Sequence, residues 1–235
     1  LLARVFVVGG EPSMAPLLEV LAQPNHRAAF FNSLLLATLV GVIGTALGFL
    51  FAFTAARAGL SPGWVRFLDI ATLLPLISPP FTTSISLIFS FGPRGLITHD
   101  LLGLKGVTIY GLSGTLAAET LTYFPIAYLT LRPVLSAMGN TLDEMAMSLG
   151  SRRLHLFRTV TLPLAVPGLA NAFLLLFACS LADFATPLIL AGNRFPVLPT
   201  EAYLQITGLF DLQGGAVLSF VLLVPALVVY IAQRY

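Results

Sequence analysis

The stretch AAFFNSLLLATLVGVIGTALGFLFAFTAA, residues 28–56, carries no charged side chain and is long enough to cross a lipid bilayer as a helix. The hydrocarbon core of a bilayer is about 30 Å thick and a helix rises about 1.5 Å per residue, so a span needs roughly 20 apolar residues. Lipid offers backbone groups no hydrogen-bond partners, and a helix satisfies them internally. The stretch is therefore predicted to be a transmembrane helix.

Further long apolar segments follow this first one along the chain. They cover approximately Phe67–Phe91, Val107–Leu131, Leu162–Ala191 and Leu212–Gln233. None shows the alternating polarity of a membrane β-barrel strand. We therefore predict an all-α fold, a polytopic transmembrane helical bundle with about five spans. Residues 1–27 are mixed in polarity and are predicted to be an extracytoplasmic approach segment to a transmembrane domain at 28–235.

The composition excludes several classes of protein. Of the 235 residues, 57% are hydrophobic and only 9% are charged, whereas a soluble domain carries about 25% charged residues. The single lysine, Lys105, and the absence of a basic patch with aromatics argue against a nucleic-acid partner. Cys179 is alone and the histidines are far apart, so we predict no metal site and no cofactor. Because the sequence starts at Leu1, we expect a piece of a longer polypeptide.

The arginines orient the predicted spans. They crowd between Arg132 and Arg158, and basic residues favour cytoplasmic loops. We therefore place the loop 133–161 in the cytoplasm. The segments 1–27, 94–105 and 194–211 are then expected outside.

Two patterns inside the spans predict local structure. The spacing Gly44-x-x-x-Gly48 permits close approach of another helix, which we interpret as packing. The run Ser78-Pro79-Pro80 interrupts the second span, because proline removes a backbone donor. Either a kink that neighbouring helices satisfy or a broken helix lining a pathway would explain it.

The cytoplasmic loop contains NTLDEMAMSLGSRRLHLFRTVTLP, residues 140–163. Thr141 and Glu144 form a capping box, and Gly150 suits the end of the helix that they start. A second short helix is expected over 152–159. Leu142, Met145, Ala146 and Leu149 make one apolar stripe on the first helix. The stripe could pack on the protein's own spans, lie on the membrane, or bind in a groove of another protein.

This loop resembles the cytoplasmic loop of permease subunits in binding-protein-dependent ABC importers. That motif reads Glu-Ala-Ala, three residues, Gly, nine residues, an aliphatic, one residue, Leu-Pro. The chain has Glu144-Met145-Ala146, Gly150 and, at the same spacing, Val160-Thr161-Leu162-Pro163. Only Met145 departs from the pattern. From Asn32-Ser33 onward the chain is most similar to the ferric-iron permeases, as in LADFATPLILAGN, residues 181–193, and FPVLPTEAYLQITG, residues 195–208.

The resemblance implies a type I importer fold in a bacterial inner membrane, paired with a second permease half, fused or separate. An ATP-binding cassette ATPase dimer would bind the loop, and an extracytoplasmic substrate-binding protein would bind outside. Glu144, Ala146 and Gly150 would shape the coupling helix, Leu142, Met145 and Leu149 would contact the ATPase, and Leu162-Pro163 would end the motif. The resemblance also implies ferric iron as substrate, with polyamine, thiamine and phosphonate left open.

The chain is not expected to be an enzyme. A nucleotide-binding P-loop needs Gly-Lys-Ser/Thr, and Gly106 follows the only lysine. ATP hydrolysis would therefore belong to the partner. A membrane-embedded enzyme built from Cys179, Ser180 and Asp183 lacks a histidine within a span.

Glu119 and Asp183 lie inside apolar spans, where ionisable groups are costly. Either they pair structurally, with Thr120, Thr122 or Tyr123 near Glu119 and Thr186 near Asp183, or they line a pathway. The second interpretation leaves an alternative function, a proton- or ion-coupled secondary transporter that uses both acids.

Overall fold

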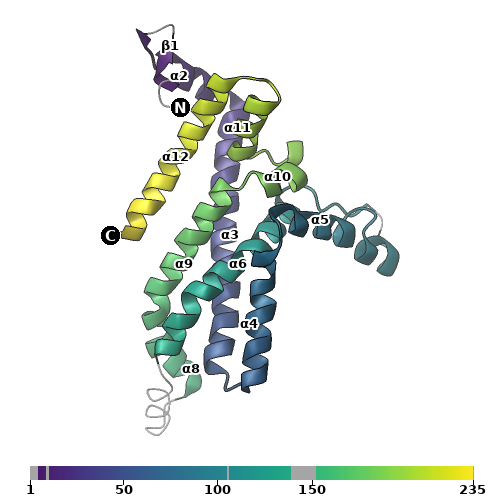
Figure 1. The fold of residues 1–235 in the computed structure, drawn as a ribbon, viewed down its shortest axis with the longest axis vertical. Coiled ribbons are helices and arrows are strands. Elements are labelled where there is room, and N and C mark those ends of the chain that lie inside the picture. The colour runs from purple at the N-terminus through teal and green to yellow at the C-terminus, as the bar shows by residue number, and fades with distance from the viewer. Residues whose placement is uncertain (1–4, 9–10, 105, 139–151, 235) are drawn as a thin grey trace. The chain divides into compact units, whose positions relative to one another are not determined.

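The computed structural model describes residues 5–8, 11–104, 106–138 and 152–234. Nearly all of the regular structure in these residues is helical (Figure 1). The longer helices are α2 (Ala15–Ala22), α3 (Pro24–Arg57), α4 (Pro62–Ile77), α5 (Pro80–Phe91), α6 (Leu112–Ala137), α9 (Leu162–Ala182), α11 (Leu198–Thr207) and α12 (Leu212–Arg234). The short ones are η1 (Leu96–Leu101), α8 (Arg153–Leu156), η2 (Phe157–Thr161), α10 (Ala185–Leu190) and η3 (Gly192–Arg194).

The described residues contain one pair of strands, and it precedes the first span. β1 (Val7–Val8) pairs antiparallel with β2 (Glu11–Pro12), with Val7 opposite Pro12 and Val8 opposite Glu11. None of the predicted spans is a strand, which confirms the all-α prediction for the membrane part.

Three helices are long and apolar enough to cross a membrane, or four if α4 and α5 count as one broken span. The three are α3, the continuous helix from Arg153 to Ala182, and α12. The helix α6 occupies the predicted third span and has 26 residues, but it is less apolar. The prediction of about five spans agrees with this set once α6 and the broken pair are included.

The prolines within the predicted spans differ in their effect on the helices. The second span is interrupted as expected, because α4 ends at Ile77, Ser78 and Pro79 are extended, and α5 begins at Pro80. Pro167 and Pro225, by contrast, lie inside the continuous helices α9 and α12. The break at Ser78-Pro79 follows from two successive prolines, since Pro80 also disfavours a helical conformation at Pro79.

The fourth predicted span, ending at Ala191, is shorter in the structure. The helix α9 ends at Ala182, and α10 begins at Ala185. Pro187 has no N–H to donate to the carbonyl of Asp183, four residues earlier, and its ring would clash there. The continuous prediction to Ala191 is therefore wrong, and the reason is local.

The second helix of the cytoplasmic loop also differs from the prediction. It exists as α8 and η2, with Arg152 as its N-cap, but it runs without a break into α9. Pro163, expected to open the span, instead lies in the second position of α9. The five residues before α9 form a π-helical turn, Phe157–Thr161, so the regular hydrogen-bond pattern is already interrupted next to Pro163.

The described residues belong to two compact units. The first unit contains Leu1–Leu39, Pro79–Glu119 and Ala178–Tyr235, and the second contains Val40–Ser78 and Thr120–Phe177. In the first unit, Ala29 of α3 packs with Leu198 and Ala202 of α11 and Leu218 of α12. Two polar contacts fix the same place: Asn32 Nδ2 donates to the Pro196 carbonyl at 2.9 Å, and the Leu198 N–H donates to Ser33 Oγ at 2.8 Å.

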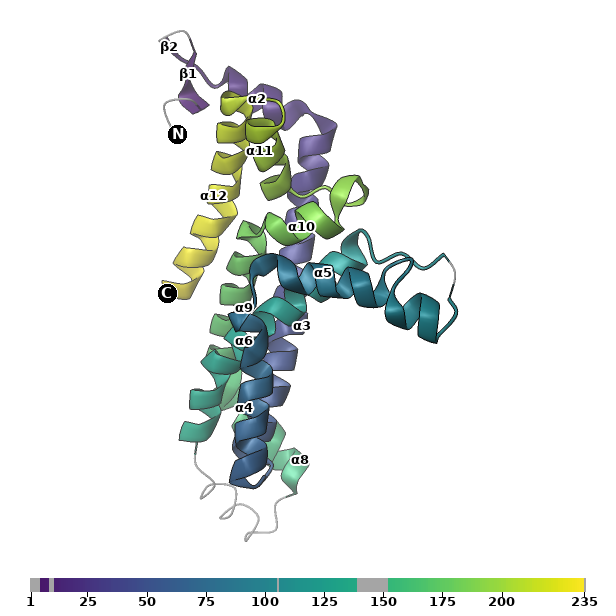
Figure 2. The same ribbon diagram turned by 45° about the vertical axis from the view of Figure 1, so that its right-hand side comes forward.

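The second unit is a bundle of parallel and antiparallel helices. Figure 1 and Figure 2 both show α4 beside the parts of α3 and α6 that belong to this unit. Its core joins buried residues of three helices, namely Ala52 of α3, Ala127, Tyr128, Leu131 and Leu135 of α6, and Ala165, Ala172 and Leu176 of α9. Each of the three helices contributes at least one alanine to the core, which lets the helix backbones approach one another closely at those positions.

Candidate functional site

The predicted coupling residues divide into two groups. Leu142, Glu144, Met145, Ala146, Leu149 and Gly150 lie outside the described residues. Leu162 and Pro163 lie at the start of α9, the first half-buried and the second exposed. What the structure describes is therefore how the two flanks of the loop are attached to the second unit.

The flank that leaves the loop is attached by aromatic rings. The Phe157 ring lies 5.5 Å from that of Phe53 in an edge-on arrangement and 6.2 Å from that of Phe49. Leu156 and Thr161, on either side, are buried. Edge-on aromatic pairs add about 0.5–1.5 kcal/mol beyond their burial, so this flank is firmly packed against α3.

The flank that enters the loop carries an ion pair. Arg132 Nη1 of α6 lies 2.9 Å from Asp69 Oδ1 of α4, and the Tyr128 hydroxyl donates to the same carboxylate oxygen. The Arg132 guanidinium also lies 5.7 Å from the centre of the Tyr128 ring. The sequence pattern alone did not pair Asp69 with Arg132. An acid and an arginine at the cytoplasmic ends of consecutive predicted spans would have been the signal for this pair.

Glu119, one of the two predicted intramembrane acids, is fully buried in the first unit. Its Oε2 accepts a hydrogen bond from the Ser180 hydroxyl. Its Oε1 has no hydrogen-bond partner among the described residues. The expected pairing with a hydroxyl is thus present, but Ser180 of α9 supplies it, whereas the sequence offered Thr120, Thr122 and Tyr123.

Asp183, the second acid, caps a helix. Its Oδ1 accepts hydrogen bonds from the backbone N–H of Ala185 at 2.8 Å and of Thr186 at 3.2 Å, at the start of α10. Thr186 is therefore a partner, as expected, although through its backbone. Asp183 and Glu119 are also close enough to interact electrostatically. The structure thus brings the two predicted acids together beside Ser180.

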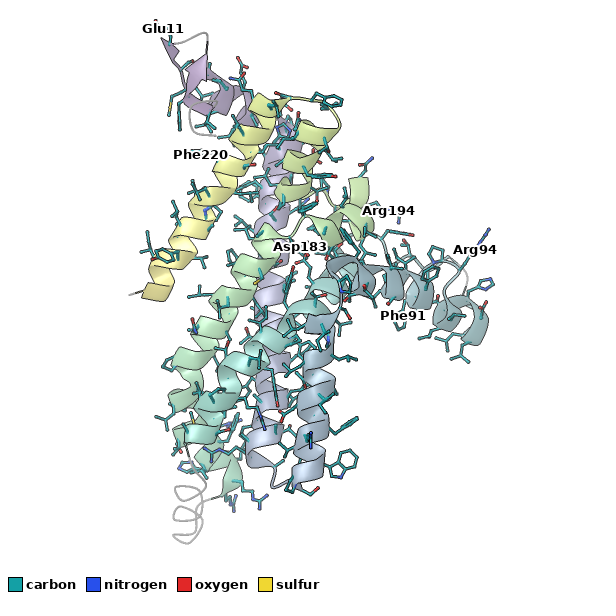
Figure 3. All side chains as sticks on the ribbon, viewed as in Figure 1. Glu11, Phe91, Arg94, Asp183, Arg194 and Phe220 are labelled. Atoms are coloured by element: carbon teal, nitrogen blue, oxygen red, sulfur yellow. The ribbon has the colours of Figure 1, made fainter. Side chains whose placement is uncertain are left out.

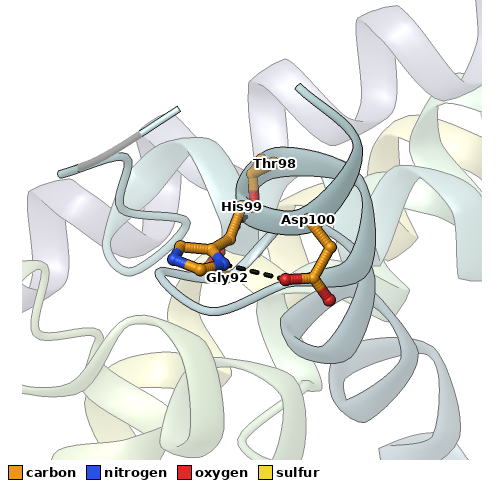
Figure 4. Close-up of polar contacts among 4 residues, drawn as sticks. All are labelled: Gly92, Thr98, His99 and Asp100. Atoms are coloured by element: carbon orange, nitrogen blue, oxygen red, sulfur yellow. Dashed lines mark hydrogen bonds and ion pairs between the residues drawn. The ribbon is translucent and has the colours of Figure 1, made fainter. Parts of the chain in front are cut away.

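The segments expected outside the membrane are held by short polar contacts. In the turn after α5, the Thr98 hydroxyl donates to the Gly92 carbonyl at 2.7 Å, and His99 Nδ1 lies 2.8 Å from Asp100 Oδ1 (Figure 4). Farther along the chain, Arg194 Nη1 donates to Thr108 Oγ1 at 2.9 Å. Figure 3 shows Arg94 at the tip of the turn after α5 and Arg194 beyond α10. These contacts order the outer segments of the first unit.

A cavity of about 420 Å³ lies between the end of α9, α11 and α12 in the first unit. Its wall is mostly apolar, and its aromatic residues, Phe184 and Tyr203, stack with ring centres 5.0 Å apart. Within the described ranges, no group of three or more His, Cys, Asp or Glu residues could hold a metal ion. The cavity therefore offers mainly hydrophobic contact.

The sequence matches one protein family over residues 44–235, described as binding-protein-dependent transport system inner membrane component. A ferric transport system permease protein, FbpB, from Actinobacillus pleuropneumoniae is 31% identical over 220 residues, which are 92% of this chain and 32% of that protein. A molybdenum transport system permease protein, ModB, from Mycobacterium bovis is 32% identical over 214 residues, 89% of this chain and 79% of that protein. The chain thus spans about a third of the length of the ferric relative.

Solved structures share the fold. A chain in the crystal structure of a bacterial alginate ABC transporter in complex with an alginate pentasaccharide-bound periplasmic protein matches with a TM-score of 0.79 at 16% identity. The match covers 92% of this chain and 79% of that one. A chain of the methionine ABC transporter MetNI, in an inward-facing conformation, matches with a TM-score of 0.71 at 16% identity. The match covers 89% of this chain and 93% of that one. At these identities the likeness concerns the fold alone.

The family match covers most of the chain, including the loop motif and α6, α9 and α12. The apolar helices make it a multi-pass protein of the inner membrane, the compartment that the family description states. The resemblance noted in the sequence is thereby confirmed: this chain belongs to the binding-protein-dependent transport system inner membrane components, the permeases of type I ABC importers.

Proposed function

We propose that the chain is the membrane-spanning part of an importer that a separate ATPase drives. The family match over residues 44–235 carries this proposal. The loop between α6 and α9 would bind the ATPase dimer in the cytoplasm, and the segments 1–27, 94–105 and 194–211 would face an extracytoplasmic binding protein. ATP hydrolysis then belongs to the partner and not to this chain.

The coupling contact would be made by the stripe of Leu142, Met145 and Leu149 on a helix that Glu144 starts and Gly150 ends. Apolar residues at i, i+3 and i+7 fit a helix-in-groove contact. The firm attachment of both loop flanks to the second unit supports this proposal, because a loop that transmits force needs rigid ends.

The test is co-purification of the full-length protein with its partners from gently solubilised membranes. We expect an ATPase to accompany the wild-type protein and to be lost from Gly150→Val, because valine cannot adopt the left-handed conformation that a helix end favours. The matched control is Gly63→Val, since a Cβ at Gly63 meets nothing within 4 Å. Retention of the ATPase by Gly150→Val at normal protein levels would contradict the coupling assignment.

We propose ferric iron as the transported substrate. Support comes from the relative FbpB, a ferric transport permease 31% identical over 92% of this chain. The molybdenum relative is similarly identical, so uptake of radioactive ferric iron and of molybdate should be compared in the same cells. The apolar cavity fits a permease that leaves recognition of the substrate to its binding protein.

We also propose that the chain pairs with a second permease half. It spans 32% of the ferric relative and 79% of the molybdenum relative. The first proportion fits one half of a fused permease, and the second fits a separate subunit.

One observation favours the alternative, an ion-coupled transporter. Glu119 is fully buried, and its Oε1 lacks a hydrogen-bond partner among the described residues. An intramembrane acid of this kind is a candidate for the transport pathway, together with Asp183. The energy source separates the two functions, because an importer needs ATP and an ion-coupled transporter needs an ion gradient.

A further inference from the structure

The helix α4 has few apolar contacts within the second unit. Thr72 is its one buried residue, and Leu73 is the residue through which it joins the core of the described second unit. An exposed apolar stripe occupies the opposite side, made of Trp64, Phe67, Ile70, Leu74 and Ile77. An element with so little buried apolar surface is held weakly by packing alone.

A polar network supplies the missing attachment. Asp69 Oδ1 of α4 forms an ion pair with Arg132 Nη1 at 2.9 Å and accepts a hydrogen bond from the Tyr128 hydroxyl. Tyr128 and Arg132 are four residues apart and share one face of α6. The side chains of Arg132 and Asp69 are 30% and 28% exposed, so the ion pair keeps part of its hydration and avoids the full desolvation cost of a buried pair.

The network stands at the entrance to the coupling loop. Arg132 lies near the C-terminal end of α6, which ends at Ala137, and the loop follows directly. On the other flank, the Phe157 ring packs against the rings of Phe49 and Phe53 of α3. Among the described residues, this polar network therefore joins α4 to α6, the helix that enters the loop.

We propose that Asp69, Tyr128 and Arg132 form a latch that makes α4 move with α6 when the ATPase displaces the loop. They are positioning residues for transport: the force reaches α4 through the carboxylate of Asp69 and travels along a rigid helix to its end before Ser78. Such coupling requires a physical connection between elements that have discrete arrangements. The inference rests on the proposed function, because it takes the ATPase as the source of the movement.

The latch is tested on the full-length complex, purified with its own ATPase and placed in lipid nanodiscs. Spin labels are attached at Phe67→Cys and Leu129→Cys, both exposed positions, in a Cys179→Ala background. The distance between the labels is measured without nucleotide and with ATP plus vanadate. We expect one narrow distance in both states for the wild-type latch, since α4 and α6 move together.

The Asp69→Asn change removes the carboxylate charge from the latch and keeps a side chain of the same size. We expect a second, longer distance to emerge on addition of ATP and vanadate. Asp100→Asn is the matched control, because Asp100 is exposed on another segment, and it should behave as the wild type. The exchange Asp69→Arg with Arg132→Asp should restore the single distance, even if either single change impairs folding.

The experiment distinguishes failure of the latch from failure of the proposed function. If the ATPase accompanies the wild type and Asp69→Asn still shows the one narrow distance with ATP, the latch is overturned and the importer stands. If no ATPase accompanies the wild type, the proposed function fails and the ATP-driven latch fails with it.

Discussion

At the scale of single residues, the two intramembrane acids differ in what their contacts do. Asp183 holds the first backbone N–H groups of α10, a task that a carboxylate or an amide oxygen performs. Glu119 receives one hydroxyl hydrogen bond and keeps Oε1 unpaired among the described residues. The contacts of Asp183 therefore explain its presence structurally, whereas those of Glu119 leave room for a role in transport.

Substituting Asp183 separates capping from charge. Asp183→Asn should keep the melting temperature in detergent, because asparagine caps helices as well as aspartate, whereas Asp183→Ala should cost about 1 kcal/mol of stability. Differential scanning fluorimetry of both variants beside the wild type measures this. A stable Asp183→Asn protein that no longer transports would show instead that the charge itself serves the pathway.

At the scale of helices, glycine decides how α3 packs. A Cβ added at Gly48 would lie 2.5 Å from the Ala127 Cβ and 2.8 Å from the Tyr128 backbone N of α6, and one added at Gly44 would lie 2.5 Å from Leu176 Cδ2 of α9. The packing predicted from the Gly44-x-x-x-Gly48 spacing is confirmed. The neighbours differ, because the Leu176 side chain can rotate away and the backbone of α6 cannot.

Gly48→Ala should therefore destabilise the second unit by about 1–3 kcal/mol, the usual cost of overpacking. Gly44→Ala should cost less, since the closest atom there is Leu176 Cδ2, the far end of a side chain, and not backbone. Gly63→Ala, where the added Cβ meets nothing within 4 Å, provides the control and should be neutral or slightly stabilising. Thermal unfolding in one detergent compares the three, and equal melting temperatures for Gly48→Ala and Gly63→Ala would refute the close contact.

At the scale of the whole molecule, the energy source distinguishes an importer from a secondary transporter. In vesicles that contain the full-length protein and its partners, import should require ATP on the cytoplasmic side and should survive a protonophore. The reason is that the family match assigns this chain to importers that use a binding protein. Uptake driven by a proton gradient without ATP would favour the alternative, and Glu119→Gln should then abolish it.

Much of the fold was predictable because it depends on local properties. A bilayer of fixed thickness requires long apolar helices, so composition alone located the spans at α3, α6 and α12. The double proline at 79–80 broke the second span, which is one of the two outcomes that the sequence left open. The motif from Glu144 to Pro163 pointed to the family because its spacing is a property of the chain and needs no coordinates.

The contacts between helices were decided by tertiary packing. The sequence by itself determined that Glu119 is an acid in an apolar segment, but its partner Ser180 comes from another helix. Likewise, Asp69 and Arg132 are ordinary charges in the sequence, and only the packing of α4 beside α6 makes them a pair. Hydrophobicity and proline act through neighbouring residues, whereas a hydrogen bond between helices depends on how each helix is rotated and how closely it approaches, which the whole bundle sets.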